Sequence, residues 1–411
     1  MKKHLGSPFV ALGYRDFRLL WIGLLISRIG SEMQVVAMNW QVYLLTGSAL
    51  SLGLIGLSRF IPVMIFSLPG GIAADRFDRK KIMLVSQVLM IIFSLILTIA
   101  TYLGNITPIH IYLLIAASSI ASTFDTPARQ SVVPYLVPKK HFVNAVSLST
   151  IMWQTAVVLG PSVAGFIIAF YGVVAVYFIN TISFLGVIFA LLSMSKIRAE
   201  ISKVTTFSFS SLIEGLNFVR HTPILYSTML LDFFATFFSS ATVLLPIFAK
   251  DILAVGPQGL GLLYAAPSVG GILAGFILSS LGHIKHQGKV LIAAVSIYGL
   301  ATIFFGITRS FYLSLFFLFF TGAGDIISTI IRNTIRQLVT PDYLRGRMVS
   351  INMLFFMGGP QLGEVEAGVV AAAFGAPLSV VIGGIGTLVA TAALSLFIPK
   401  LIKYRGDELA V

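Results

Sequence analysis

The sequence predicts an all-α membrane protein with twelve transmembrane helices in two pseudo-symmetric bundles of six. Three observations carry this prediction: the composition, the spacing of the apolar segments, and a repeat between the two halves of the chain. Of the 411 residues, 57% are hydrophobic and only 10% are charged, and the mean hydropathy is +0.96. These values lie outside the range of soluble domains, so we expect a chain that crosses the membrane many times.

Apolar stretches long enough to cross a hydrocarbon core of about 30 Å recur along the whole chain. The first follows a polar, basic N-terminus and lacks a small-residue cleavage site, so we interpret it as a span rather than a signal peptide. The twelve predicted spans are 17–44, 49–70, 82–103, 109–133, 143–170, 173–195, 223–249, 257–281, 289–307, 311–338, 347–373 and 376–399.

The net charge is +13, and the basic residues that produce it are distributed as expected for a membrane protein. Lysine and arginine gather in the turns on one side of the membrane, and only Lys250 and Arg309 fall on the other side. By the positive-inside rule the basic side is cytoplasmic. We therefore expect a multi-pass protein of the plasma (inner) membrane, with both termini in the cytoplasm and no nucleic-acid partner.

The longest polar interval, Ser195 to Pro223, divides the spans into two groups of six. The expected parts are an N-terminal bundle at 1–195, a cytoplasmic linker with a short interfacial helix at 196–222, and a C-terminal bundle at 223–411.

The two halves also resemble each other. Arg129 precedes Pro134 by the same spacing as Arg336 precedes Pro341, an offset of 207 residues. Parallel repeats of this kind are typical of transporters that bind substrate between their halves, near the bilayer midplane.

The segment GIAADRFDRKK, residues 71–81, places four basic and two acidic side chains between two apolar runs. It resembles the loop between helices 2 and 3 of the major facilitator superfamily of secondary transporters, which reads roughly G-x-x-x-D-R-x-G-R-K. The matching residues are Gly71, Asp75, Arg76, Arg79 and Lys80. Asp78 stands where the family usually has glycine.

Other segments resemble the enterobactin-exporter and macrolide-efflux branch of this superfamily. They are FDTPARQSVVPYLV at 124–137, LGPSVAG at 159–165 and RQLVTPDYLRGRMVSIN at 336–352, so the resemblance covers nearly the whole chain. It implies the major facilitator fold, a small-molecule substrate carried through the lipid bilayer, a monomer, and no cofactor.

Span five contains a segment similar to the G-x-x-x-G-P-x-x-G-G pattern of antiporter branches. This chain has Ala156, Gly160, Pro161, Ala164 and Gly165 there, and the resemblance implies export. Small residues allow close helix approach and proline permits a bend, which suits a gate. Ordinary helix packing is the alternative.

The resemblance also implies a cytoplasmic gate. Asp75 would contact the N-terminal end of span eleven and neighbouring arginines when the transporter faces outward, and Arg76 and Arg79 belong to the same gate. Asp125 and Arg129 are i,i+4 on span four, and we place them in that network. The alternative role of these charges is to set the topology alone.

Ionisable groups at bilayer depth usually mark ion or substrate pathways. Arg28 and Glu32 share one face of span one at i,i+4, so they can form an ion pair. Arg28 lies about 16 Å inside the span, at 1.5 Å per residue. Asp232 follows 204 residues later on span seven, which places opposite charges at equivalent positions of the halves. A pair that only locks helices together is the alternative.

Four further charges complete the candidates for the proton or substrate pathway. Glu364 and Glu366 lie on different faces of span eleven, and we favour Glu366 as the proton carrier. Asp325 lies on span ten, and Arg59 on span two is a counter-charge or an anion-binding group. Burial disfavours the charged form of a carboxyl group, so such groups can load and release protons as an antiporter requires.

These features favour a proton-coupled exporter of amphiphilic small molecules: hydrophobic drugs, macrolides or siderophore-like compounds. Aromatic side chains for an apolar cavity are Trp40, Tyr43, Trp153, Phe233, Phe234, Phe237 and Phe238. The sequence contains no ATP-binding, zincin or nucleophile-elbow motif and no cysteine, so we expect neither an enzyme nor a metal site. A facilitator or importer of an anionic metabolite, using Arg28 and Arg59, and a transport-inactive sensor or partner remain the alternatives.

Overall fold

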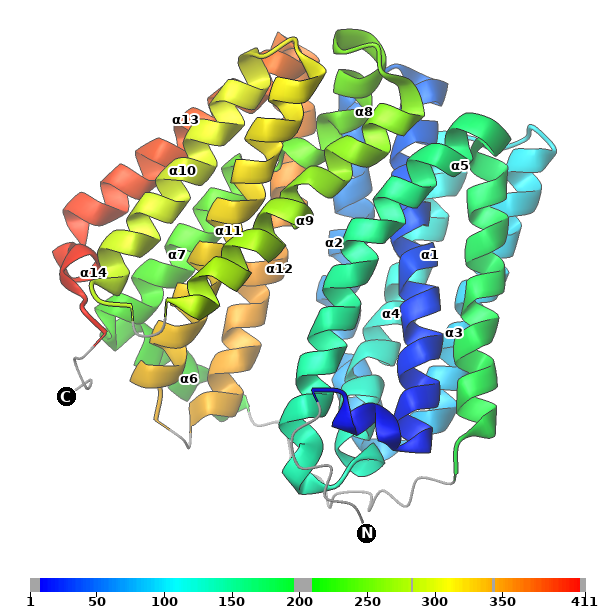
Figure 1. Ribbon diagram of the computed structural model, residues 1–411, viewed down its shortest axis with the longest axis horizontal. Helices are drawn as coiled ribbons and strands as arrows, with labels where there is room; N and C mark the ends of the chain where they lie inside the picture. The colour runs from blue at the N-terminus through cyan, green and yellow to red at the C-terminus, as the bar shows by residue number, and fades with distance from the viewer. Residues whose placement is uncertain (1–7, 196–208, 282–283, 342–343, 407–411) are drawn as a thin grey trace. The chain divides into compact units, whose positions relative to one another are not determined.

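The computed structural model describes residues 8–195, 209–281, 284–341 and 344–406, in which helices are joined by short turns (Figure 1). Residues 196–208 of the expected linker lie outside the described residues. The long helices are α1 (Arg15–Thr46), α2 (Ala49–Arg76), α3 (Arg79–Tyr102), α4 (Pro108–Leu136), α5 (Phe142–Ser193), α7 (Pro223–Phe238), α9 (Gly256–Ser280), α10 (Gln287–Ile307), α11 (Phe311–Val339), α12 (Arg345–Phe374) and α13 (Ala376–Phe397). Shorter helices are α6 (Phe209–His221), α8 (Leu245–Ile247) and α14 (Pro399–Lys403).

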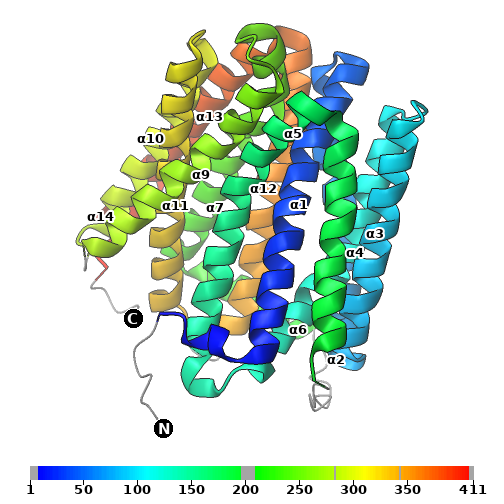
Figure 2. The same ribbon diagram turned by 45° about the vertical axis from the view of Figure 1, so that its right-hand side comes forward.

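Ten helical segments of the described chain are long and apolar enough to cross a membrane, judged by length and composition. One of them, Lys139–Ser193, contains two predicted spans, because Gly172 interrupts α5 with a φ of 76°. This backbone conformation favours a residue without Cβ. The second arm of α5 then turns back, and α1 lies between the two arms (Figures 1 and 2). With the 30-residue α12, every predicted span except the seventh coincides with continuous helix.

The seventh span differs from the prediction of an unbroken helix over 223–249. Helix α7 ends at Phe238, and a 3-10 turn (Ala241–Leu244), α8 and a π-helical turn (Phe248–Ile252) follow it. Two buried serines occupy the break. Ser239 contributes a carbonyl that accepts a hydrogen bond from the Tyr298 hydroxyl at 3.3 Å, and the Ser240 hydroxyl donates to the Thr236 carbonyl at 2.6 Å. Neighbouring hydroxyls thus satisfy the freed backbone groups, which allows a helix to break inside a membrane.

The chain divides into two compact units, a first unit of residues 1–46 and 61–205 and a second unit of 47–60 and 206–411. The first half of α2 therefore belongs to the second unit, where it packs on α12. A Cβ added at Gly53 would lie 2.9 Å from the Glu364 carbonyl oxygen and 3.0 Å from the Gly368 Cα. The division into six-helix bundles at 195 and 223, with a linker between them, stays a prediction, and α6 occupies Phe209–His221 of that interval.

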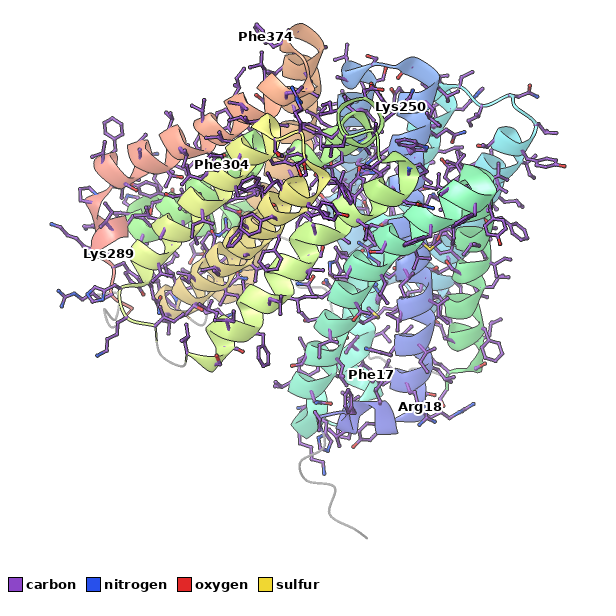
Figure 3. All side chains as sticks on the ribbon, turned by 45° about the horizontal axis from the view of Figure 1, so that its top comes forward. Phe17, Arg18, Lys250, Lys289, Phe304 and Phe374 are labelled. Carbon is purple, nitrogen blue, oxygen red and sulfur yellow. The ribbon has the colours of Figure 1, made fainter. Side chains whose placement is uncertain are left out.

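In the first unit, α1 packs on both arms of α5 through small residues. A Cβ at Gly23 would lie 2.7 Å from the Gly186 carbonyl oxygen on the second arm. At the start of α1, Phe17 is buried in an apolar cluster with Met83 and Leu191, while the neighbouring Arg18 is exposed (Figure 3). Because lipid is as apolar as these side chains, close van der Waals packing is what holds such helices together.

The helices of the second unit also pack closely through small residues. Helices α9 and α11 approach closely at Gly322, beside the Pro267 carbonyl, and α10 meets α13 at Gly299 and Gly384. Leu225 and Ile335 are fully buried in its apolar cluster.

The helix limits give no single offset for the internal repeat. Helices α4 and α11 both contain 29 residues and begin 203 positions apart, at Pro108 and Phe311. Helices α2 and α9 begin 207 positions apart, at Ala49 and Gly256. The offset of 207 residues between the two halves therefore stays a prediction.

Candidate functional site

The predicted pair on α1 forms in the first unit. Arg28 Nη2 lies 2.9 Å from Glu32 Oε1, and the two side chains are 29% and 18% exposed. The guanidinium also lies 3.6 Å from the centre of the Trp153 ring on α5, which adds a cation–π contact.

The predicted antiporter segment packs directly behind this pair. Gly160, Pro161 and Gly165 are buried on α5. A Cβ added at Gly160 would lie 2.5 Å from the Cβ of Glu32 and 3.0 Å from the Ile29 carbonyl oxygen. Gly160 is therefore what allows α5 to approach α1 at the level of Glu32. Ala156 and Ala164, at the positions of two glycines in the pattern, are both fully buried.

Asp125 and Arg129 on α4 form the other predicted pair within one helix, with 3.6 Å between Asp125 Oδ2 and Arg129 Nε. Asp125 is buried, and its Oδ1 accepts a hydrogen bond from Gln87 Nε2 on α3 at 3.2 Å. Arg129 also lies within electrostatic range of Arg28. The first unit thus gathers two acidic and two basic side chains from α1 and α4.

The charged loop between α2 and α3 is tied to the ends of other helices. Lys80 Nζ donates to the Met194 carbonyl beyond α5 at 3.0 Å. Arg79 donates to the Ser131 carbonyl near the end of α4 at 3.4 Å, and its guanidinium lies 5.4 Å from the Tyr135 ring centre. Basic side chains are favourable at helix C-termini, where carbonyls lack partners.

Asp78, the departure from the family pattern, caps α3. Its Oδ1 accepts hydrogen bonds from the backbone N–H groups of Lys80 at 2.9 Å and Lys81 at 3.3 Å. Asparagine, aspartate and serine are the preferred residues at this position, and glycine is a weaker cap. The substitution therefore has a local structural role.

The other members of the loop motif are less constrained within the first unit. Asp75 and Arg76 are exposed. A Cβ at Gly71 would meet no atom within 4 Å, whereas one at Gly70 would lie 2.5 Å from the Thr123 carbonyl oxygen on α4. Close helix packing here requires Gly70, which the pattern did not single out. The predicted gating contact of Asp75 stays a prediction.

In the second unit, Asp232 on α7 forms an ion pair with Arg332 on α11. Only 8% and 9% of these side chains are exposed, and Arg332 Nη2 also donates to Thr329 Oγ1 at 2.8 Å. Sequence reasoning missed Arg332. The signal was present, because Arg332 lies inside the predicted span 311–338, as does Asp325, which was selected.

Asp325 lies within electrostatic range of both members of this pair. Tyr298 on α10 also lies within electrostatic range of Asp232 and Arg332. Its hydroxyl donates to the Ser239 carbonyl, where the helix of span seven is interrupted. The arrangement brings two carboxylates around one buried guanidinium.

Arg59 and Glu364 meet between α2 and α12, also within the second unit, with 3.8 Å between Arg59 Nη1 and Glu364 Oε1. A Cβ at Gly56 would lie 2.7 Å from the Glu364 Cβ, so Gly56 makes room for this side chain. Glu366, two residues on, is half-buried and points to another face of α12. Gly359 and Gly363 pack against Phe233 and Phe237 of α7, so they mark a face different from that of Glu364.

The α7 phenylalanines form a continuous aromatic cluster of half-buried rings. The rings of Phe233 and Phe237 stack with centres 5.8 Å apart, and those of Phe237 and Phe238 meet edge to face at 5.2 Å. Trp40 and Tyr43 are buried in α1, whereas Trp153 is 42% exposed.

Two compact units of membrane helices that hold ionisable side chains inside their spans are typical of polytopic membrane transporters. The fold is similar to that of a bacterial homologue of the human lysosomal transporter Spinster in an inward-facing, occupied conformation. The TM-score is 0.73 at 15% sequence identity, over 94% of this chain and 97% of that one. The predicted twelve-helix all-α fold is confirmed.

A family model described as transmembrane secretion effector matches residues 6–406, and the chain belongs to this family of the major facilitator superfamily. It is 27% identical over 406 residues to the staphyloferrin A transporter of Staphylococcus aureus, covering 95% of this chain and 96% of the relative. It is 24% identical over 393 residues to the enterobactin exporter of Shigella boydii, covering 95% and 93%. The predicted resemblance to this superfamily and its exporter branch is confirmed.

Proposed function

We propose that the protein exports amphiphilic small molecules by alternating access, driven by antiport of protons. The observation that supports this most directly is that carboxylates inside the membrane helices face guanidinium groups. Glu32 faces Arg28, Glu364 faces Arg59, and Asp232 faces Arg332. A carboxylate that binds a proton loses its attraction for its partner, so protonation can release one helix from another.

The pairs between helices suit this coupling better than the pairs within a helix. Asp232 and Arg332 connect α7 to α11, and Arg59 and Glu364 connect α2 to α12. Protonation of Asp232, with Asp325 close by as a second carboxylate, would loosen α7 where its helix already breaks. Glu366, which forms no ion pair with another residue in the described part of the chain, is the remaining candidate for a carrier.

The proposed substrates are hydrophobic drugs, macrolides or siderophore-like compounds. Similarity to a staphyloferrin A transporter and an enterobactin exporter supports the siderophore-like class. The aromatic cluster of α7 supports an apolar, ring-containing substrate, because binding sites for such molecules are lined mainly by apolar and aromatic side chains.

We also propose a monomer in the plasma (inner) membrane, with cytoplasmic termini and no cofactor beyond the proton gradient. Its two six-helix bundles, 1–195 and 223–411, would alternate access around the substrate. Asp75, Arg76 and Arg79 would close the cytoplasmic side, with Gly71 and Lys80 in the same loop.

The alternative of an anion facilitator built on Arg28 and Arg59 is disfavoured by the pairing of both arginines with glutamates. A transport-inactive sensor or partner is distinguished from an exporter only by measuring flux.

The test is uptake into inside-out membrane vesicles that contain the protein. A panel of macrolides, lipophilic cations and catecholate siderophores is offered with and without an imposed proton gradient. Gradient-dependent accumulation of at least one compound is expected. Absence of flux in folded protein would contradict export, and gradient-independent flux of an anion would favour the facilitator.

The carboxylates are then compared as neutral variants. Glu32→Gln, Asp232→Asn and Glu366→Gln are measured beside Asp251→Asn, a control at an exposed position beyond the seventh span. We expect gradient-driven uptake to fall in at least one of the three and to persist in the control. Full retention in all three would exclude these groups as obligatory carriers.

A further inference from the structure

A cavity of about 230 Å³ lies within the second unit among α7, α11 and α12. The polar residues of its lining are Thr228, Asp232, Thr329, Arg332, Asn333 and Arg336, with Asn352 from α12, and all of them except Asp232 carry N–H or O–H groups. Asp232 is the one proposed proton carrier in this lining, and the aromatic cluster of α7 contributes no residue to it.

The charges of the cavity wall are unbalanced. Its one carboxylate, Asp232, is paired with Arg332. Arg336 donates from Nη2 to Asn333 Oδ1 at 2.7 Å, and no carboxylate of the described residues lies within ion-pair distance of its guanidinium. Asp325 acts on Arg332 and Asp232 from outside the lining. Asp232 also acts on Arg336 at longer range, so the lining holds two guanidinium groups and one carboxylate, and that carboxylate is already paired with Arg332.

We propose that this cavity binds an anionic oxygen group, a carboxylate or a phosphate, with Arg336 as the principal contact. A guanidinium presents a planar fork of N–H donors that matches two oxygens of such a group. The carboxamides of Asn333 and Asn352 supply neutral N–H donors around it, whereas the Thr228 hydroxyl already donates to the Leu225 carbonyl at 2.9 Å. The ion pair with Asp232 holds the Arg332 side chain in the cavity lining. Because the Asp232 carboxylate is already paired with this guanidinium, it does not offer a site for another cation.

The size of the cavity limits the ligand. Drug-sized molecules occupy pockets of about 300–1,000 Å³, so this cavity takes a small acid or the charged group of a larger molecule. Arg336 is three residues before the end of α11 at Val339, about 5 Å along the helix axis at 1.5 Å per residue. A soluble organic acid and the phosphate of a lipid headgroup can both reach a site at this depth.

Binding is measured on the full chain at equilibrium. Purified protein in neutral detergent is titrated with citrate and with inorganic phosphate by calorimetry, and protein in nanodiscs of phosphatidylcholine with or without phosphatidylglycerol is followed by thermal unfolding. The variants are Arg336→Gln, Arg336→Lys and Asn352→Ala. Lys289→Gln is the matched control, since it removes one positive charge at the exposed start of α10, outside the cavity (Figure 3).

We expect Arg336→Gln to weaken binding by about tenfold or more, as loss of a charge-assisted hydrogen bond does. Arg336→Lys should retain part of the affinity, Asn352→Ala should lose a few-fold, and Lys289→Gln should match the parent protein. Effects on citrate or phosphate identify a soluble acid, and an effect confined to phosphatidylglycerol nanodiscs identifies a lipid headgroup.

The proposal is overturned if none of the three probes binds the parent protein, or if Arg336→Gln binds them as the parent does. Arg336→Lys and Asn352→Ala keep the test decisive should Arg336→Gln fail to fold. Equilibrium binding requires no transport, so its failure would leave the export proposal untouched, and absence of flux would leave this site untouched.

Discussion

In the first unit the ion pairs inside the membrane form within single helices, whereas in the second unit they connect one helix to another. The within-helix pairs are Arg28–Glu32 on α1 and Asp125–Arg129 on α4. The between-helix pairs are Asp232–Arg332, from α7 to α11, and Arg59–Glu364, from α2 to α12. Only a pair of the second kind holds two helices together, so only its loss changes helix packing directly.

The first unit connects its helices partly through charged groups, since the Asp125 carboxylate on α4 accepts from Gln87 on α3, and partly through neutral groups. Gln34 Oε1 on α1 accepts hydrogen bonds from Asn180 Nδ2 on α5 at 2.7 Å and from Ser94 Oγ on α3 at 2.8 Å. The Tyr177 hydroxyl donates to Gln41 Oε1 at 2.7 Å. Amides and hydroxyls keep their form through the physiological pH range, so this network does not respond to protons. The described ion pairs that connect one helix to another, which protonation can break, therefore lie in the second unit.

The largest effect is expected from Asp232→Ala. Removing one partner of a buried pair leaves the other charge uncompensated, which destabilises by about 3–5 kcal/mol. Thermal unfolding in detergent measures the loss. The double variant Asp232→Ala, Arg332→Met, which leaves no unpaired charge, should recover much of it. Equal stability of the single variant and the parent would remove the basis of the comparison.

Gly160→Ala tests a contact between helices of the first unit that depends on shape rather than charge. The added Cβ would meet Glu32 Cβ at 2.5 Å, so α1 and α5 must separate, and overpacking of this kind costs about 1–3 kcal/mol. Gly71→Ala is the control, because a Cβ there meets no atom within 4 Å. Its thermal unfolding should be unchanged or slightly higher, and a similar loss in both variants would contradict the packing argument.

Asp78→Ala tests a local contact at the start of α3. The alanine side chain cannot accept the hydrogen bonds from the two backbone N–H groups that Asp78 caps. Replacing an N-cap residue by alanine lowers the free energy of unfolding by about 1 kcal/mol. Asp78→Gly, which restores the residue of the family pattern, should cost less, and Asp78→Ser should be nearly neutral. Thermal unfolding of the three variants side by side gives the order, and a reversed order would exclude capping as the role of this aspartate.

The smallest effect on stability is expected from Glu32→Gln. An i,i+4 pair on one helix stabilises by only about 0.2–0.5 kcal/mol, and Arg28 keeps its contact with Trp153. A loss as large as that of Asp232→Ala would show that pairs within a helix and between helices are equivalent here, against the comparison above.

Contacts close in sequence were predictable. The pairs Arg28–Glu32 and Asp125–Arg129 follow from a spacing of four residues on a helix, and the spans follow from hydropathy. Arg332 was overlooked although hydropathy placed it inside a span, since no acidic residue lies three or four positions away from it on α11. Its partner Asp232 is 100 positions away and meets it only when α7 packs beside α11.

The sequence by itself determined the class of the fold, the places of the membrane spans and the pairs within helices, because hydrophobicity and the helical repeat act over a few residues. Only the tertiary structure decided that α7 breaks at Ser239, that the first half of α2 packs on α12, and that Asp232 meets Arg332. The physical reason is that these features depend on which helices lie side by side. A hydroxyl or guanidinium on one helix pairs with a polar group on another, and a glycine allows two helices to approach closely. Local sequence patterns do not specify which helices become neighbours.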